Sequence, residues 1–330
     1  MISGTFPLDR AVEPKLCIVI PSYNCAQWLG RAVESAFLFC PSPKSVVVVD
    51  DGSTDNTSAV CARLLERFAN LKVLVKTNGG LSSARNHGIE YALKERLGDY
   101  LVLLDADDML LPADLSFLSA GRHDMVRIGV EEIVEGKDGT ICHCESNAAL
   151  TGKGYLRERF DSNSFYTPSW AYLYRLEWLR EHELRFVDGL IHEDNLFTVQ
   201  ALMAAQSVMV VPDLVYRYIR REGSITTAPA RDKLLLRVDA YCEIAAHLTT
   251  MANQERDFDL RWKIDEVLGG AHHLADQCDG VGPMMSVLQA QLRYMMAYRG
   301  FGSPGFRYKQ RQDLKARLQG VGTQIMKALG

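Results

Sequence analysis

Four short, mostly apolar runs, joined by three segments with helical spacing, constrain the fold of this 330-residue chain more than any other feature. The runs are Leu16–Ile20, Val46–Val49, Lys72–Val75 and Tyr100–Leu104. Between them, apolar residues recur every three or four positions, as on one face of a helix. Strands buried on both faces form such runs, and their alternation with helices is typical of a parallel sheet with right-handed connections. The sequence therefore predicts an α/β fold.

Polar side chains follow three of these predicted strands. They are Tyr23 and Asn24, then Asp50 and Asp51, then Asp105 and Asp107. Because parallel strands end at one edge of the sheet, we expect these groups to lie together there. An aromatic ring that stacks on a base, and carboxylates that bind a metal or ribose hydroxyls, suit a nucleoside diphosphate.

The three carboxylates of Asp105, Asp107 and Asp108 have no basic residue between them. Like charges this close repel, so a cation is their natural partner, and oxygen ligands suit Mg²⁺ or Mn²⁺. The alternative is an acidic turn in which Asp108 caps a short helix. Asn24 and Ser82 are candidate caps for the helices that follow them.

Composition and missing motifs exclude several classes. A content of 47% hydrophobic and 24% charged residues is ordinary for a globular protein, and a net charge of -4 gives no case for nucleic-acid binding. The eight cysteines match no zinc pattern. The sequence lacks the Gly-x-Gly-x-x-Gly, P-loop and Gly-x-Ser-x-Gly patterns. Without a signal peptide or a run of ~18 apolar residues, the expected location is the cytoplasm.

Four linked motifs closely resemble family 2 glycosyltransferases of the GT-A fold. They are Ile-Val-Ile-Pro-Ser-Tyr-Asn at 18–24, Val-Val-Asp-Asp-Gly-Ser-Thr-Asp at 48–55, Gly-Gly-Leu-Ser-Ser-Ala-Arg-Asn-His-Gly-Ile at 79–89, and Leu-Leu-Asp-Ala-Asp-Asp at 103–108. Their order and spacing match as well. The resemblance implies a nucleotide-sugar donor, a divalent metal (Mn²⁺ or Mg²⁺) and inversion at the anomeric carbon.

Site residues carry over from the family motif by motif. The nucleotide-sugar-binding candidates are Pro21, Tyr23, Asp50, Asp51, Arg85, Asn86, Asp105 and Asp107, of which Asp107 and Asp105 are the metal candidates. The alternative for Arg85 is an ordinary surface helix residue.

The middle of the chain holds a second acidic pair. Family 2 enzymes carry a similar Glu-Asp pair at the head of a helix, so the resemblance assigns Asp194 as catalytic base with Glu193 beside it. The alternative is that these acids only complement the helix dipole. Nearby, Met125–Val134 suggests a strand pair with a turn at 135–139, and 145–165 a loop over the donor. Trp170 fits either a sugar site or the core.

The last third departs from the family. Tyr-Arg and Gly-Ser-Ile-Thr segments near 216–226 still resemble the end of its catalytic domain, and a basic loop there suits a diphosphate. Beyond it, helical spacing and methionine pairs predict packed helices. Residues 291–330 carry eight basic residues against one acid, so we expect peripheral contact with the inner face of the membrane; a subunit interface or solvated helix is the alternative.

These observations predict a GT-A-type, mostly parallel α/β domain at 1–226 and a helical C-terminal extension at 227–330. The nucleotide-binding half would span about 15–115 and the acceptor half about 116–226. The predicted reaction is inverting, metal-dependent sugar transfer from a nucleoside diphosphate sugar, with UDP favoured, to a glycan or glycolipid hydroxyl in bacterial surface polysaccharide synthesis. The alternatives are a sugar-nucleotide nucleotidyltransferase and a noncatalytic glycan- or nucleotide-sugar-binding relative.

Overall fold

The structure, a computed structural model, describes residues 14–42, 44–115, 118, 123–136, 139–146, 148–221, 231–255, 260–278, 282–297, 315, 316 and 319. The chain forms two compact units that alternate along the sequence. The first consists of Met1–Leu156, Pro168–Gly189 and Gln200–Arg221, and the second of Arg157–Thr167, Leu190–Val199 and Glu222–Gly330. The domain boundary predicted near residue 226 on the family resemblance stays a prediction.

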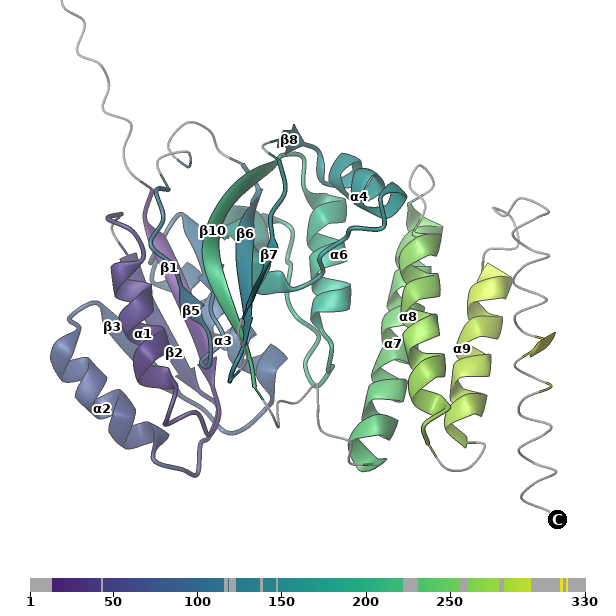
Figure 1. Cartoon of the computed structure of the whole chain (residues 1–330), viewed down its shortest axis with the longest axis horizontal. Coiled ribbons are helices and arrows are strands. Elements are labelled where there is room, and N and C mark those ends of the chain that lie inside the picture. The colour runs from purple at the N-terminus through teal and green to yellow at the C-terminus, as the bar shows by residue number, and fades with distance from the viewer. Residues whose placement is uncertain are drawn as a thin grey trace, which may run out of the picture. The chain divides into compact units, whose positions relative to one another are not determined.

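The described strands of the first unit form one sheet of ten (Figure 1). They are β1 (Leu16–Ser22), β2 (Lys44–Asp50), β3 (Leu71–Val75), β4 (Tyr100–Leu103), β5 (Met109–Leu110), β6 (Met125–Val134), β7 (Thr140–His143), β8 (Ala148–Leu150), β9 (Tyr172–Arg175) and β10 (Val208–Arg220). The main order is β3-β2-β1-β4-β9-β6-β10-β5, with β7 beside β6 and β8 beside β10. The four apolar runs of the sequence thus lie together in one half of the sheet.

The strand directions confirm the α/β class. β1 is parallel to β2 and β4, and β2 is parallel to β3, as predicted for the first four strands. The other half of the sheet is mixed, because β9 runs antiparallel to both β4 and β6 while β10 is parallel to β6. Parallel order ends where the chain no longer returns through a long helix between neighbouring strands.

Helices cover both faces of the parallel half. They are α1 (Leu29–Leu38), α2 (Thr57–Arg67) and α3 (Leu81–Lys94). Right-handed connections place α1 and α2 on one face and α3 on the other (Figure 1). The rings of Phe37 and Phe68 stack at 4.3 Å between α1 and α2. On the other face, a Cβ added to Gly88 of α3 would lie 2.4 Å from Val19, so only glycine allows this close approach to β1.

Two predicted helix caps were wrong. α1 begins at Leu29, and Asn24 instead adopts a left-handed φ of 53°. Its side-chain oxygen accepts hydrogen bonds from the Thr54 and Asp55 amides, at 2.8 and 3.2 Å, so it fastens the loop after β1 to the loop after β2. Ser82 lies inside α3, for which Gly80 is the N-cap. The side-chain oxygens of asparagine and serine can accept hydrogen bonds from any nearby amide. For Asn24, the loop after β2 provides these amides.

The hairpin predicted after Met125 is confirmed, and the long loop predicted after it is wrong. β6 and β7 pair antiparallel across the 135–139 turn, where Gly136 has a φ of 76°. The segment 145–165 contains β8 and helix α4 (Gly152–Asp161), so it is not a loop. β8 finds its partner in β10, some sixty residues later, which local spacing does not reveal. A short helix α5 (Leu176–Glu181) follows β9.

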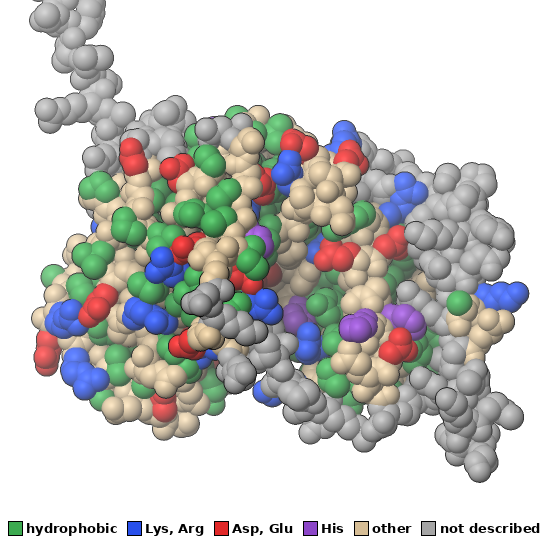
Figure 2. All heavy atoms as spheres, viewed as in Figure 1, with side chains coloured by type: hydrophobic (Ala, Val, Ile, Leu, Met, Phe, Trp, Pro, Cys, Tyr) green, Lys and Arg blue, Asp and Glu red, His purple; other side chains and the backbone are tan. Residues whose placement is uncertain are grey.

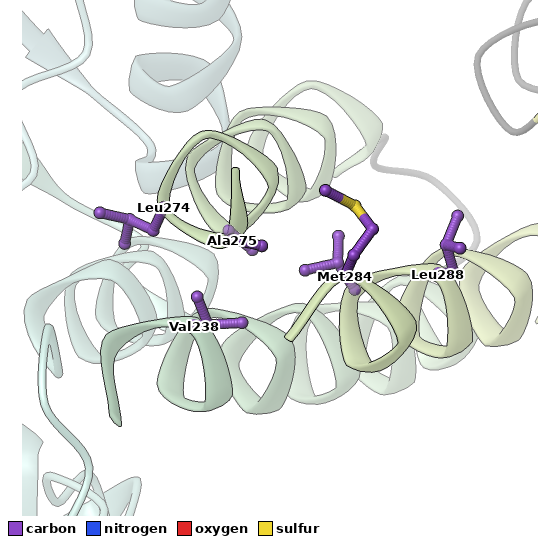
Figure 3. Packing of buried hydrophobic residues seen from close by; sticks show 7 residues of the cluster. Val238, Leu274, Ala275, Met284 and Leu288 are labelled. Atoms are coloured by element: carbon purple, nitrogen blue, oxygen red, sulfur yellow. The ribbon is translucent and has the colours of Figure 1, made fainter. Parts of the chain in front are cut away.

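The second unit contains the predicted C-terminal helices. They are α7 (Arg231–Gln254), α8 (Arg261–Ala275) and α9 (Gly282–Ala297), and α6 (Asp194–Ala204) begins in this unit. Figure 3 shows how side chains from α7, α8 and α9 meet in one apolar cluster. Met284 is 3% exposed within it, so the packing role predicted for the methionine pairs is confirmed for Met284, whereas Met285 and Met296 are exposed.

Two predictions fall largely outside the part of the chain that the structure describes: the Gly-Ser-Ile-Thr segment at 223–226 and the basic tail beyond Ala297. Among the described residues, no helix has both the length and the apolar character needed to cross a membrane. On the viewed face of the first unit, acidic and basic side chains are intermixed (Figure 2). This face therefore offers no single-sign patch for a polyanion.

Candidate active site

The end of β1 presents one buried and one exposed candidate. Pro21 lies within β1, paired with Val49 of β2, and is buried. Tyr23, two residues further, is 49% exposed, so its ring is open to a planar ligand. The strand ends here because the chain turns at Asn24. The structure therefore leaves Tyr23, but not Pro21, with a free side-chain surface at this edge.

The two aspartates that end β2 are both buried and both accept hydrogen bonds from the chain itself. Asp50 accepts from the Ser53 amide at 2.9 Å. Asp51 accepts from Lys76 Nζ at 2.7 Å and from the amides of Gly79 and Gly80, at 3.0 and 2.7 Å. The Asp51 carboxylate thus fixes the Gly-Gly turn that precedes α3. Any contact of these aspartates with a nucleoside stays a prediction.

Arg85 and Asp105 form an ion pair at the end of β4. Arg85 Nη2 lies 2.9 Å from Asp105 Oδ1, and the Arg85 side chain is 1% exposed while that of Asp105 is 25% exposed. The guanidinium also lies over the ring of Phe186, 5.1 Å from its centroid. Arg85 is therefore not the surface residue of the alternative reading. It is a buried cation that faces the acidic turn.

Asp107 pairs with a second arginine. Arg221 Nη2 donates to Asp107 Oδ2, and the guanidinium carbon lies 3.6 Å from the centroid of the Trp28 ring. Burial and, after it, the negative charge of Asp105 raise the pKa of Asp107, while Arg221 opposes this shift. The positive charge of Arg221 therefore stabilises the ionised form of Asp107.

Asp108 fastens the acidic turn to β10. It is 1% exposed, accepts from the Ile219 amide at 2.8 Å and from the Tyr216 hydroxyl at 2.7 Å, and caps no helix. Burial, followed by the charges of Asp105 and Asp107, raises its pKa well above the ordinary value. The Tyr216 hydroxyl also accepts from the Asp105 amide at 3.1 Å. Asp108 is thus a structural residue of the site, and its neighbours carry the open carboxylates.

Two further residues lie behind this edge. Asn86 donates to the Phe186 carbonyl at 2.8 Å and to Asp188 at 3.1 Å, and accepts from the Phe186 amide at 2.9 Å, so it holds the 186–188 segment beside α3. Trp170 is 5% exposed and stacks on Tyr216 with ring centroids 4.3 Å apart. This settles the open choice for Trp170 in favour of the core.

The residues at the end of β4 fit a divalent ion only if a bound phosphate group and water supply the rest of its ligands. The described part of the chain contains no group of three or more His, Cys, Asp or Glu side chains placed to hold an ion. Asp105 and Asp107 alone offer partly exposed carboxylates that repel one another. Mg²⁺ in phosphate-transfer sites commonly takes one or two carboxylates and completes its shell with water and phosphate oxygens. The two aspartates match that arrangement.

Glu193 and Asp194 belong to the second unit. Asp194 is the first residue of α6 and is half-buried, while Glu193 is buried. The Glu193 carbonyl accepts from the amides of Leu196 and Phe197, at 3.1 and 3.0 Å, which closes the first helical turn. His192, just before the pair, adopts a left-handed φ of 58° and stacks on Tyr241 with centroids 4.8 Å apart.

Several residues of these sites escaped the sequence reasoning. Tyr216, Lys76 and Lys263 carry polar contacts that join segments distant in the sequence. For Arg221, the sequence predicts no more than a place in a basic loop. The signal available for Arg221 was its position directly after a strand of alternating character.

Comparison with known proteins identifies the segment that carries the strand-end site. Residues 17–121 match the family model "Glycosyl transferase family 2". This segment is a family 2 glycosyltransferase domain. The match covers β1 to β5 and therefore includes the aspartates at 50, 51, 105 and 107.

Individual relatives agree with this assignment. The chain is 25% identical over 228 residues to an uncharacterized glycosyltransferase, YibD of Escherichia coli K12, covering 64% of this chain and 63% of YibD. It is 30% identical over 178 residues to chondroitin synthase of Pasteurella multocida, covering 52% of this chain and 17% of the synthase. The matches thus span less than two thirds of either relative.

A solved structure shows the same fold over most of the chain. A fragment of S. aureus TarS in complex with UDP-GlcNAc superimposes with a TM-score of 0.63 at 23% identity, covering 86% of this chain and 81% of that fragment. The likeness confirms the GT-A-type α/β fold predicted from the four motifs.

Proposed function

We propose that this protein transfers a sugar from a nucleoside diphosphate sugar to a hydroxyl of a glycan or glycolipid, with inversion at the anomeric carbon. The observation that carries the proposal is the carboxylate pair Asp105 and Asp107 at the end of β4, each beside an arginine, within a family 2 domain. UDP is the favoured nucleotide, supported by the UDP-GlcNAc complex of TarS. Chondroitin synthase among the relatives supports a role in polysaccharide synthesis, and we propose that the product is a bacterial surface polysaccharide.

The residues of the first unit would bind and orient the donor. Tyr23 offers an exposed ring for the base, and Asp105 and Asp107 would hold a divalent ion together with the diphosphate. Bound there, the ion would neutralise charge that builds on the leaving diphosphate. Arg221 would exchange its pairing with Asp107 for contact with phosphate oxygens, which guanidinium groups bind well.

Asp194 would act as general base in the proposed reaction. Its carboxylate takes the proton of the acceptor hydroxyl while that oxygen forms a bond to the anomeric carbon and the bond from this carbon to the diphosphate breaks. A base removed from such a step typically costs 10²–10⁴-fold in rate. Glu193, which is buried beside it, is the second candidate.

The test is product analysis with matched variants. The protein is incubated with UDP-GlcNAc, UDP-glucose or UDP-galactose and Mn²⁺, with water as the acceptor in place of a glycan hydroxyl, and UDP and pyrophosphate are measured. We expect UDP release in the wild type and a loss of about 100-fold or more in Asp194→Asn, with UDP affinity unchanged. Glu177→Gln is the control, since Glu177 also lies in the first turn of a helix, α5. Pyrophosphate as the product would favour a nucleotidyltransferase, and near wild-type turnover by Asp194→Asn would remove Asp194 as the base.

A further inference from the structure

The second unit contains a fully buried cation that the proposed reaction does not use. Lys263 on α8 has a side chain that is 0% exposed. Burial lowers its pKa, and the carboxylate of Glu266 opposes that shift. Removing a charge from water is costly, and a buried ion pair seldom repays the cost as net stability. A buried lysine therefore calls for an explanation through the groups that it binds.

The ammonium group of Lys263 has three kinds of partner, all in the second unit. Nζ donates to Asn195 Oδ1 at 2.9 Å, to Thr167 Oγ1 at 3.2 Å and to the Glu266 carboxylate at 3.0 and 3.1 Å. It also lies 5.4 Å from the centroid of the Phe165 ring. Its only partner on α6 among these is Asn195, the residue directly after Asp194.

Asn195 connects Lys263 to the backbone on the other side of the acidic pair Glu193 and Asp194. Its side-chain nitrogen donates to the His192 carbonyl at 3.2 Å, and its own amide donates to the same carbonyl at 3.0 Å. The bonds between residues 192 and 195 enclose Glu193 and Asp194 in one closed turn. Because Lys263 holds the oxygen of the Asn195 amide group, the nitrogen is directed to His192, and the orientation of the turn depends on α8.

A second helix, α7, also contacts this turn. Arg237 Nε donates to His192 Nε2 at 3.1 Å, and Tyr241 stacks on the His192 ring with an angle of 12° between the planes. His192 has the left-handed backbone conformation that only a well-determined environment maintains in a residue with a side chain. α7 and α8 thus contact the residues on both sides of Glu193 and Asp194.

We propose that Lys263 is a positioning residue that sets the orientation of Asp194 through Asn195. This inference rests on the proposed function, in which Asp194 takes the proton of the acceptor. A residue that only stabilises the fold would change the amount of active protein. A positioning residue changes the turnover of each folded molecule, since a base misplaced by about 1 Å can cost on the order of 10²-fold.

The test compares Lys263→Met with a control that disturbs the same unit elsewhere. Methionine preserves the length of the side chain and removes the charge. Leu274→Ala is the control, because Leu274 lies in the apolar cluster of α7, α8 and α9 and not in the contacts of the 192–195 turn (Figure 3). For Lys263→Met we expect kcat for UDP release to fall roughly 10- to 100-fold, with UDP affinity within about two-fold. Leu274→Ala should melt earlier and keep its kcat.

Two further measurements keep the inference falsifiable if Lys263→Met folds poorly. Asn195→Ala should reproduce the loss of kcat, and the double variant should lose no more than either single variant, because both break one chain of contacts. Hydrogen exchange of the Leu196 and Phe197 amides, which close the turn on Glu193, should quicken in Lys263→Met and Asn195→Ala and stay unchanged in Leu274→Ala.

The outcomes separate this inference from the proposed function. If Asp194→Asn is inactive while Lys263→Met keeps its kcat and its amide protection, the positioning role is overturned and the proposed function stands. If Asp194→Asn is fully active, the base assignment fails and the positioning role fails with it. Additive losses in the double variant would also overturn it, because Lys263 and Asn195 would then act independently.

Discussion

The hydroxyl of Tyr216 allows a sharp test of how the acidic turn is held. Tyr216→Phe removes one oxygen atom and leaves the ring, with its stack on Trp170, in place. That oxygen donates to Asp108 at 2.7 Å and accepts from the Asp105 amide at 3.1 Å, in a fully buried position. The substitution therefore removes a hydrogen-bond partner from Asp105 and from Asp108, and it creates almost no cavity.

The size of the effect follows from these two bonds. A hydrogen bond to a charged group contributes about 1.5–3 kcal/mol, and a neutral one about 0.5–1.5 kcal/mol. Asp108 retains its bond from the Ile219 amide, so the loss should lie near 3 kcal/mol of unfolding free energy in total. For a unit of this size that corresponds to roughly 6–12 °C in melting temperature.

Tyr218→Phe is the matched control. Its ring also lies against Trp170, at 5.4 Å between centroids, and its hydroxyl forms no hydrogen bond with any residue that the structure describes. We expect this variant to unfold within about 0.5 kcal/mol of the wild type, as substitutions outside special contacts do. Urea unfolding of the three proteins measures the differences. If Tyr216→Phe and Tyr218→Phe are equally stable, the hydroxyl of Tyr216 does not hold the turn, and the reasoning fails.

Three further predictions concern the metal, pH and the tail. Asp107→Ala should abolish Mn²⁺-dependent UDP binding in calorimetry and alter the unfolding free energy by less than about 1 kcal/mol; unchanged affinity would refute the metal assignment. Burial and Arg237 lower the pKa of His192 from 6.5 to about 4, so below pH 6.5 the unfolded chain binds a proton that the folded chain does not. Unfolding free energy should therefore fall between pH 6.5 and 5, by up to about 2 kcal/mol more in the wild type than in His192→Gln, and equal losses in urea titrations would contradict this. Truncation after Ala297, which leaves α9 whole, should remove binding to anionic vesicles; equal flotation of both proteins would exclude a membrane role for the tail.

Local patterns predicted the parallel half of the sheet because its signals are local. The runs Leu16–Ile20, Val46–Val49 and Tyr100–Leu104 are buried on both faces, and such strands need no distant partner to be recognised. The remaining run forms β3 at the end of the strand order and is partly exposed. The positions of Asp50, Asp51, Asp105 and Asp107 at strand ends follow from those runs alone. Their proposed roles toward a donor stay predictions.

Distant contacts account for what the sequence did not reveal. For Arg85, the resemblance predicts a donor-facing residue and leaves a helix surface residue as the alternative. Its pairing with Asp105 and its place over Phe186, a hundred residues later, show it to be buried. Asn24 and Ser82 have the residue types of caps, but competing amides or the helix start decided otherwise. Lys263 resembles any helical lysine until Asn195 is placed beside it. The spacing of residues along the chain predicts contacts within a few helical turns, and it does not predict contacts between these distant pairs.

The strand order of the first unit has a consequence for the nascent chain. β4 needs β9 as its second neighbour, and β9 in turn lies against β6, which pairs with β10, a strand that ends at Arg220. At about 5–20 residues per second, the ribosome delivers β9, the strand that covers this edge of β4, on the order of several seconds after β4. Throughout that interval the apolar edge of β4 is an unpaired template for strands of other chains. Slow synthesis or high expression should therefore favour aggregation of this protein before its sheet is complete, and chaperones that cover extended apolar segments should raise its yield.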